Sequence, residues 1–293
     1  IEAKDIMLST GPFTSGVNVN YHLILPVVLG ATVVVLEKFH WRKVVEMTPR
    51  EQVTVLFAVP LIFDLLARLP SSYHPDLSSL RLCISGGTHL ADAIADRFYR
   101  RFNIRIGQGY GGVHFAPAFT VNGGQTPGAV GRKDGVFPVG IIDDRGKATG
   151  PGKIGEIAFD TRQIKNRWAR LALSRNPNRR GRYVYTGDLG RLDERGNLFV
   201  VGRKSALIKV AANSVTPAEV EDALRSHPRV QDAVVFPLRT GQTDESVGAV
   251  VVRNGRLTRE ELIDHCSQRL DPYKCPRSIS FRKSLPRNPH GKI

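Results

Sequence analysis

The sequence predicts an α/β protein with a parallel sheet, followed by a β-rich segment and a smaller α+β module. In the first third, short β-branched runs alternate with helical patterns, which is typical of βαβ units. From about Gly123 to Val201, glycines and aspartates separate short alternating runs, which indicates a small antiparallel sheet or barrel. After Gly202, marked helix starts alternate with strand-like runs as far as Ile293.

Buried parallel strands are predicted where β-branched and other apolar residues run together. These runs are residues 31–37 (ATVVVLE), 53–59 (VTVLFAV), 80–85 (LRLCIS) and the start of 104–112 (IRIGQGYGG). Helices are predicted between the strands, from Pro60 until Pro70 and over residues 91–102. Glycine turns follow the last two strands, at Gly86-Gly87 and at residues 107–112. Because open α/β sheets bind ligands at the carboxyl ends of their strands, we expect a ligand site at these turns.

Two helix starts are predicted in the last module from N-cap patterns. Thr216 precedes a proline and stands three residues before Glu219, and Thr258 stands three residues before Glu261. A hydroxyl that accepts from the third helical N–H, with a Glu that reaches back, is the capping box. Both threonines are therefore predicted to cap their helices.

Charge predicts an anionic partner for this chain. Of its 293 residues, 42 are Lys or Arg and 27 are Asp or Glu, a formal net charge of +15. Such a balance suits nucleotides, CoA phosphates, an acidic carrier protein or nucleic acid, but no aromatic interleaving or zinc-finger spacing supports nucleic acid. Much of the charge falls in one stretch, which we interpret as a solvated loop. Its basic residues are Arg162, Lys165, Arg167, Arg170, Arg175, Arg179, Arg180 and Arg182.

Neither a membrane span nor a secretory signal is predicted. The most apolar stretch, residues 22–37, is interrupted by Pro26 and Gly30 and is shorter than the run of about 18 apolar residues that a span requires. We expect it to form a buried helix and a strand. The three cysteines lack paired or metal-type spacing, which favours a reduced cytoplasmic location. The opening IEAKDIMLST lacks an initiator Met and is expected to be the middle of a longer protein.

Five stretches occur in a fixed order: VTVLFAVPLIFDLLARL, LRLCISGGTHL, GQGYGGVH, YTGDLGRLDERGNLFVVGRKSALIKVAANSVTPAEVEDAL and LDPYKCPRSISFRKSLPRNPHGKI. Together they resemble the adenylate-forming superfamily of acyl-CoA synthetases, luciferases and adenylation domains over nearly the whole chain. The resemblance implies the C-terminal portion of the large AMP-binding domain over residues 1–202, α/β over 1–122 and β-rich over 123–202. It implies a mobile α+β domain over residues 203–293, after a hinge near residues 203–207.

The resemblance also implies nucleotide contacts. Asp188, in the run Tyr-Thr-Gly-Asp, matches the aspartate that holds both ribose hydroxyls, and Arg203 matches an arginine that contacts the ribose. Tyr110 matches the aromatic residue that stacks on adenine. Taken singly, Asp188 would suit a glycine-rich turn and Tyr110 a core position. The loops implied to lie against adenine and the acyl group contain Gly86, Gly87, Thr88, Gln108, Gly109, Tyr110 and Gly111.

Two residues are candidate catalysts. Lys292, in LPRNPHGKI, matches the lysine that bridges the acid carboxylate and the α-phosphate, although a lysine near a chain end is usually just solvated. His114 stands where the family usually has a glutamate near Mg²⁺, and Val113 where it has a threonine on the α-phosphate. Neutral imidazole is a poor Mg²⁺ ligand, so we assign no metal ligand and expect triphosphate and water to hold the ion. Protonated His114 could instead pair with phosphate.

Three further departures bear on activity. The family's Ser/Thr/Gly-rich phosphate loop lies upstream of the position that matches Ile1, so these residues alone are not expected to complete an ATP site. Ala212 stands for a glycine beside the pantetheine tunnel, and Ala206 for an Asp or Lys of the hinge. Residues 10–13 (TGPF) replace an opening that usually carries a histidine near the acyl pocket.

Three functions remain open from the sequence. The first is an acyl-CoA synthetase, which uses ATP and Mg²⁺ to join a carboxylic acid to AMP and then passes the acyl group to CoA. The second passes it to the phosphopantetheine arm of an acidic carrier protein. The third is a degenerate member that binds ligand without turnover.

Overall fold

The computed structural model describes residues 1–11, 13, 16–36, 40–112, 120–122, 125–134, 138–165, 167–211, 213–239 and 245–288. The chain divides into two compact units. The first comprises Ile1–Thr186 with Arg191–Phe199, and the second Gly187–Gly190 with Val200–Ile293. The functional boundary between residues 202 and 203, and the hinge that follows it, stay predictions.

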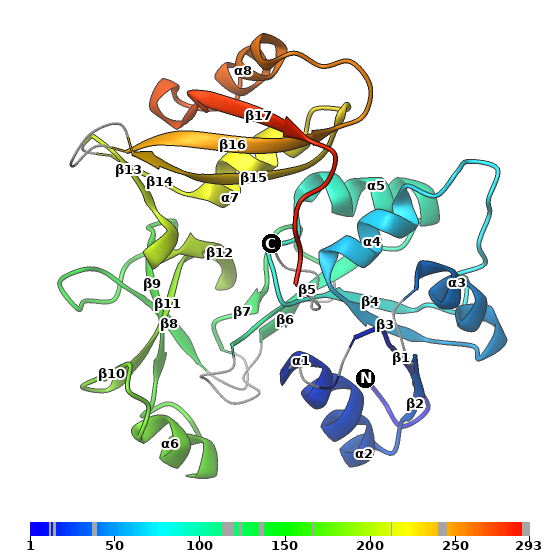
Figure 1. Cartoon of the computed structure of the whole chain (residues 1–293). Helices are drawn as coiled ribbons and strands as arrows, with labels where there is room; N and C mark the ends of the chain where they lie inside the picture. Colours follow the sequence, from blue (N-terminus) through cyan, green and yellow to red (C-terminus); the bar gives the residue numbers. More distant parts are fainter. Residues whose placement is uncertain are drawn as a thin grey trace. The chain divides into compact units, whose positions relative to one another are not determined.

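The first unit contains a six-stranded sheet in the order β2-β1-β3-β4-β5-β6 (Figure 1). Its strands are β1 (Ile6–Ser9), β2 (Thr32–Val35), β3 (Val55–Ala58), β4 (Leu82–Ser85), β5 (Ile106–Tyr110) and β6 (Thr120–Asn122). Strands β1 to β5 run parallel, and β6 runs antiparallel to β5. The predicted parallel sheet is confirmed: the four predicted runs supply β2 to β5, although the 31–37 run forms the edge strand β2, and β1 comes from residues 6–9, where no strand was predicted.

Helices cover both faces of this sheet (Figure 1). They are α1 (Gly16–Val19), the π-helix η1 (Asn20–Ile24), α2 (Leu25–Leu29), α3 (Trp41–Arg50), α4 (Pro60–Ala67) and α5 (Asp92–Phe102). On one face, Phe63 of α4 meets Phe98 of α5 edge to face at 5.3 Å, within the main core. On the other face, Tyr21 of η1 packs on Phe57 and Ile84.

Residues 22–37 differ from the prediction of a buried helix and strand. His22 and Pro26 are buried, but Val27 and Val28 are 77% and 74% exposed and Val35 is 55% exposed. The helical valines are exposed because η1 and α2 turn only one side toward the sheet, whereas Val35 lies in β2, an edge strand of the sheet. Hydropathy alone does not distinguish the two sides of such a helix.

The β-rich segment forms a second sheet in the order β7-β12-β11-β9-β8, with β10 paired to β11. The strands are β7 (Gly131–Arg132), β8 (Val139–Ile142), β9 (Gly155–Asp160), β10 (Arg179–Arg180), β11 (Tyr183–Leu192) and β12 (Asn197–Arg203). The outer strands of this order are β7 and β8. The N–H of Val139, the first residue of β8, donates to the carbonyl of Lys133, the residue after β7, at 2.9 Å. The predicted antiparallel arrangement is confirmed.

The basic stretch is more ordered than the predicted loop. It contains helix α6 (Arg167–Ser174) and strand β10, and all eight of its cations are exposed. Apolar Ile164 and Leu173 are buried and attach the stretch to the unit. The charge pattern correctly indicated solvation, but it concealed these two buried positions.

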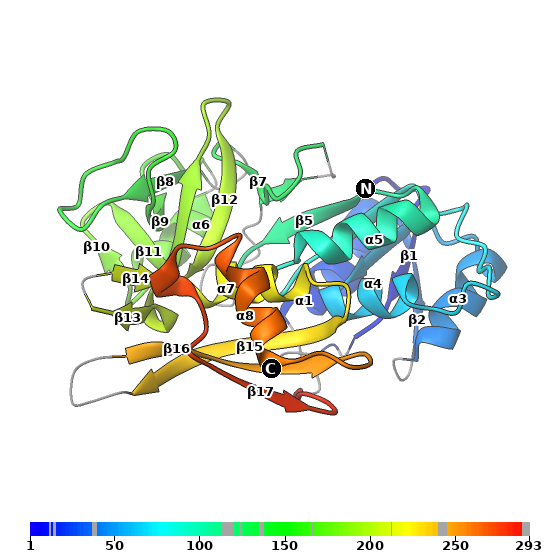
Figure 2. The same cartoon turned by 90° about the horizontal axis from the view of Figure 1, so that it is seen from above.

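The second unit is an α+β module. Its elements are a 3₁₀ turn η3 (Lys204–Ala206), β13 (Ile208–Val210), β14 (Asn213–Val215), α7 (Pro217–Arg225), β15 (Val230–Arg239), β16 (Glu245–Arg253), α8 (Arg259–Ser267), η4 (Pro272–Lys274) and β17 (Ser278–Arg282). Strands β15 and β16 are antiparallel, whereas β16 and β17 are parallel. Figure 2 shows this sheet with α7 and α8 beside it, and Leu224 of α7 and Leu262 of α8 lie in its core.

Only one of the two predicted caps forms. Thr258 accepts from the Glu261 N–H at 3.1 Å, and Glu261 accepts from the Thr258 N–H at 2.7 Å, a complete capping box. Thr216 makes no side-chain cap bond, so that prediction was wrong. Thr216 is buried with its methyl group close to Gly202, where an added Cβ would lie 2.5 Å from Thr216 Cγ2. Packing at Gly202 therefore sets the role of this threonine.

Candidate functional site

Gly86-Gly87 follows the carboxyl end of β4 as predicted, but Gly107 to Tyr110 belong to the neighbouring strand β5, where residues 108–110 pair with β6, so the prediction of a turn over them was wrong. Ser85 pairs with Gln108 in the parallel register, which places Gly86 next to Gly109 in the sheet. The Gly86 N–H donates to the Ala58 carbonyl at 3.1 Å, and Gly87 adopts φ +89°, a conformation that glycine accommodates without strain. The structure thus brings seven of the predicted site residues to one edge of the sheet. They are Gly86, Gly87, Thr88, Gln108, Gly109, Tyr110 and Gly111.

The phenyl ring of Phe57 forms the floor beneath these residues. An added Cβ on Gly86 would lie 2.7 Å from Phe57 Cζ, and one on Gly109 would lie 3.7 Å from Phe57 Cε2. The ring of Tyr21 stacks on the Phe57 ring, with their centroids 4.2 Å apart. Neither Phe57 nor Tyr21 was predicted as part of the site, because an aromatic residue of a strand or a helix gives no local signal of which distant loop it will contact.

We expect Gly86→Ala to destabilise the first unit by about 1–3 kcal/mol, the usual cost of overpacking. The new methyl group must displace Phe57, which is buried and stacked against Tyr21. Chemical denaturation would measure this loss. Gly150→Ala is the matched control, since no heavy atom lies within 4 Å of its added Cβ. Equal stability of the two variants would contradict this account of the Gly86 contact.

His22 lies behind this floor and is 2% exposed. Its ring meets Phe57 edge to face at 6.0 Å, and its Nδ1 is 3.2 Å from Asn18 Oδ1. Nε2 has no hydrogen-bond partner among the described residues. Burial lowers the pKa of His22 to about 4, and the Leu8 main chain opposes this only in part. The imidazole is therefore neutral near pH 7.

Asp188 and Arg203 form the second predicted contact group, which belongs to the second unit. Arg203 Nε lies 2.8 Å from Asp188 Oδ1, and the side chains are 59% and 9% exposed. The preceding Gly187 adopts φ +77°, which turns the strand at this point. The structure thus brings together the two residues predicted to bind ribose. The carboxylate is held in place by a guanidinium that itself faces solvent.

The two predicted catalytic residues, His114 and Lys292, lie outside the described residues, as do Val113 and Ala212. Among the residues that the structure describes, no group of three or more His, Cys, Asp or Glu side chains is arranged to hold a metal ion. All three cysteines are free thiols. Among the described helices, none is long and apolar enough to cross a membrane.

Two segments of the chain match known protein families. Residues 1–166 match the AMP-binding enzyme family, and residues 219–292 match the AMP-binding enzyme C-terminal domain. A 4-coumarate–CoA ligase of Nicotiana tabacum is 32% identical across 100% of this chain and 56% of its own length. A long-chain-fatty-acid–CoA ligase of Bacillus subtilis is 29% identical across 100% of this chain and 53% of its own length.

A solved structure has the same fold over the whole chain. The anthranilate CoA ligase AuaEII, determined in complex with anthranoyl-AMP, superposes with a TM-score of 0.85 and 26% identity, covering 100% of this chain and 58% of that enzyme. The chain thus spans about half the length of the relatives it matches. The chain belongs to the AMP-binding enzyme family.

Proposed function

We propose that this chain is part of an ATP-dependent, AMP-forming ligase that activates a carboxylic acid as its acyl-adenylate and then transfers the acyl group to CoA. The observation that carries the proposal is the juxtaposition of Gly86 and Gly109 at neighbouring strand ends. Gly86 is buried against the Phe57 ring, whereas Gly87 is exposed and Gly109 half-buried, so a planar base could approach the backbone of these two residues without obstruction by a Cβ. The family match and the CoA ligase relatives support the same chemistry.

The described residues have distinct proposed roles. Tyr110, half-buried at the end of β5, would stack on the adenine while the neighbouring glycines lie against the base and the acyl group. Asp188 would accept hydrogen bonds from the two ribose hydroxyls, and Arg203 would orient it. The 3₁₀ turn of residues 204–206 is exposed and short, which suits the proposed hinge.

The chemistry proposed for Lys292 and His114 follows from charge. In the first step a carboxylate oxygen bonds to the α-phosphorus, and the bond to pyrophosphate breaks. The Lys292 ammonium would stabilise the negative charge that is shared between the two reacting groups. In the second step the thiolate of CoA attacks the acyl carbon, and AMP leaves. His114 would bind phosphate when protonated.

Mg²⁺ would accompany ATP and be held chiefly by its phosphates and water. The residues next to the proposed adenine surface, Gln108 to Gly111, provide no carboxylate, so the ion would not be bound by this segment itself. We also propose a reducing compartment such as the cytoplasm, which the free thiols Cys83, Cys266 and Cys275 support.

Exchange of labelled pyrophosphate into ATP would test the adenylation step. The longer native protein should catalyse exchange in the presence of its acid, with aromatic and fatty acids as the first panel because relatives act on both kinds. Lys292→Ala should abolish most of the exchange while preserving folding. Failure to exchange with every acid, together with an unchanged Lys292→Ala variant, would refute the proposal.

The acceptor and the degenerate alternative are decided by two further measurements. Transfer of label to the phosphopantetheine arm of a carrier, but not to free CoA, would indicate carrier loading in place of CoA ligation. Calorimetric binding of ATP, AMP or an acyl-sulfamoyl analogue without any turnover would indicate a non-catalytic member.

A further inference from the structure

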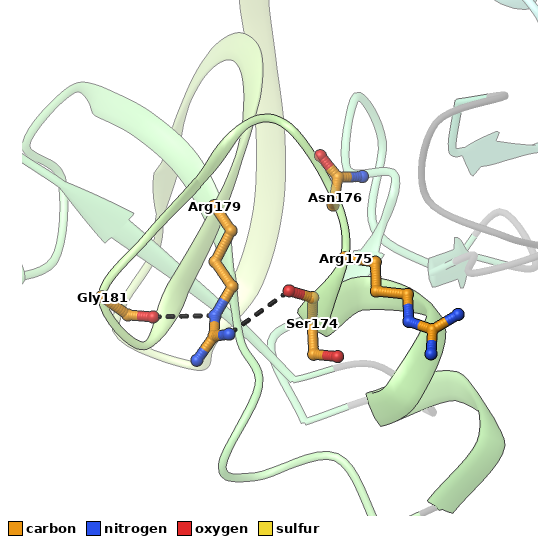
Figure 3. A pocket seen from close by; sticks show the side chains of 5 residues that line it. All are labelled: Ser174, Arg175, Asn176, Arg179 and Gly181. Atoms are coloured by element: carbon orange, nitrogen blue, oxygen red, sulfur yellow. Dashed lines mark hydrogen bonds between the residues drawn. The ribbon is translucent and has the colours of Figure 1, made fainter.

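A basic pocket lies outside the proposed nucleotide site, between the end of α6 and strand β10. Its volume is about 460 Å³, and it is lined by Ser174, Arg175, Asn176, Arg179 and Gly181 (Figure 3). All five residues belong to the first unit. A pocket of this size is in the usual range for a small organic ligand. We propose that it binds the phosphate group of a small anion.

Among the residues that the structure describes, the Arg179 guanidinium is held by carbonyl oxygens and not by a carboxylate. Its Nε–H donates to the Gly181 carbonyl at 2.9 Å, and its Nη1 donates to the Ser174 carbonyl at 3.3 Å. Figure 3 shows the side chain between these two groups. The carbonyl dipoles fix the orientation of the planar guanidinium, but no described carboxylate neutralises its charge. Three of the five guanidinium N–H donors remain for a ligand.

The backbone around Arg179 is itself fixed. The Arg179 N–H donates to the Asn176 carbonyl at 3.0 Å, and Asn178 N–H donates to Asn176 Oδ1 at 2.9 Å. Arg179 also pairs with Val184 in the ladder between β10 and β11. Because the turn and the ladder both restrain this segment, the fork is positioned before a ligand arrives, which lowers the entropic cost of binding.

The charge around the pocket favours a multiply charged anion. Between Arg162 and Arg182 the sequence has eight Lys or Arg residues and no Asp or Glu. Asp160, just before this stretch, lies 3.8 Å from Arg162 and 3.4 Å from Arg182. Among the described residues, Arg175 at the pocket has no ion pair. Phosphate carries up to two charges and several acceptor oxygens, so it gains more from this field than a carboxylate does.

Arginine predominates in this stretch, which also fits phosphate. Seven of the eight basic residues between 162 and 182 are Arg and only Lys165 is Lys. A planar guanidinium binds two oxygens of one phosphate at once, whereas an ammonium acts as a point charge. The phosphate group could belong to a soluble metabolite or to a lipid headgroup, and the experiment separates these sources.

Protection from phenylglyoxal, which modifies arginine side chains, locates the bound anion. Pyrophosphate at constant ionic strength should protect Arg179 and Arg175 of the full chain, as quantified by peptide mass spectrometry, whereas acetate should not. Arg179→Gln should weaken pyrophosphate binding about tenfold or more, because it removes hydrogen bonds to a charged group. Arg179→Lys keeps the positive charge but loses the planar guanidinium, so its affinity for pyrophosphate should lie between those of the native chain and Arg179→Gln.

Matched variants separate this pocket from other sources of binding. Arg145→Gln removes an exposed arginine from the β8–β9 turn of the same unit and should leave affinity nearly unchanged. Asp188→Ala should also leave pyrophosphate binding at Arg179 intact, so failure of the proposed ligase function would not affect this result. If Arg145→Gln and Arg179→Gln weakened pyrophosphate binding equally, the anion would be attracted by the overall positive charge and not by this pocket. That result would overturn the proposal.

A vesicle arm identifies the source of the phosphate. Vesicles of phosphatidylcholine with phosphatidic acid should be compared with phosphatidylcholine alone in a sedimentation assay, using the native chain and Arg179→Gln. Arg179-dependent binding to phosphatidic acid in the absence of pyrophosphate binding would support the site with a lipid source. Arg179-dependent binding of free pyrophosphate supports a soluble source, and dependence on Arg179 in neither arm refutes the proposal.

Discussion

Asp188→Ala is expected to lower kcat/KM for ATP about 100-fold in the longer native protein. The variant removes a charged acceptor that is proposed to bind both ribose hydroxyls, and hydrogen bonds to charged groups contribute about 1.5–3 kcal/mol each. Two such bonds, about 3–6 kcal/mol together, correspond to roughly two to four powers of ten in rate, so a 100-fold loss is the lower end of the expected range. Pyrophosphate exchange at varied ATP concentration measures the loss.

Folding should change much less than activity in this variant. Arg203, the ion-pair partner that remains in the variant, is 59% exposed, so water solvates its unpaired charge. Asp188→Asn should retain part of the activity because its amide oxygen still accepts. Glu194→Ala removes an exposed acid between β11 and β12 and serves as the charge control. Activity of Asp188→Ala equal to that of Glu194→Ala would exclude a ribose role for Asp188.

Acid is expected to destabilise the first unit through His22. The pKa of this residue falls from 6.5 to about 4 on folding. Below pH 6.5 the unfolded chain binds a proton that the folded chain refuses until about pH 4, so the unfolding free energy decreases as pH falls. A pKa lowered from 6.5 to about 4 corresponds to about 3 kcal/mol of unfolding free energy, which is lost progressively between pH 6.5 and 4. Denaturant titrations across this range measure the slope.

His22→Gln should flatten that slope, because glutamine binds no proton in this range. The variant is expected to be less stable at pH 7, since it disturbs the contacts with Asn18 and Phe57. His74→Gln is the matched control, because His74 is exposed, and it should retain the native slope. Carboxylates also titrate near pH 4, but they are common to all three proteins and cancel in the comparison. An identical slope in His22→Gln would show that the acid sensitivity arises elsewhere.

Local signals were sufficient for four of the six strands of the first sheet, whereas β1 and β6 were not predicted. The runs VTVLFAV and LRLCIS became β3 and β4, and Pro60 begins α4 as expected. Their β-branched residues and the fixed φ of proline act within a few residues of chain, so sequence alone reveals them. Thr258 formed its capping box for the same reason, whereas Thr216 makes no cap bond and is buried with its methyl group close to Gly202.

Some features of the candidate site were visible in the sequence, and others depend on tertiary packing. Glycine positions such as Gly86 and Gly109, the Tyr-Thr-Gly-Asp run and the excess of arginines are properties of the sequence itself. That Phe57 lies under two of those glycines, and that His22 is buried behind it, depends on residues distant in the chain. Likewise, composition indicated an anion, but only the fold holds Arg179 between two carbonyl oxygens. The sequence determined residue chemistry and local conformation, whereas tertiary packing decided exposure and which groups meet, because both depend on contacts between distant segments.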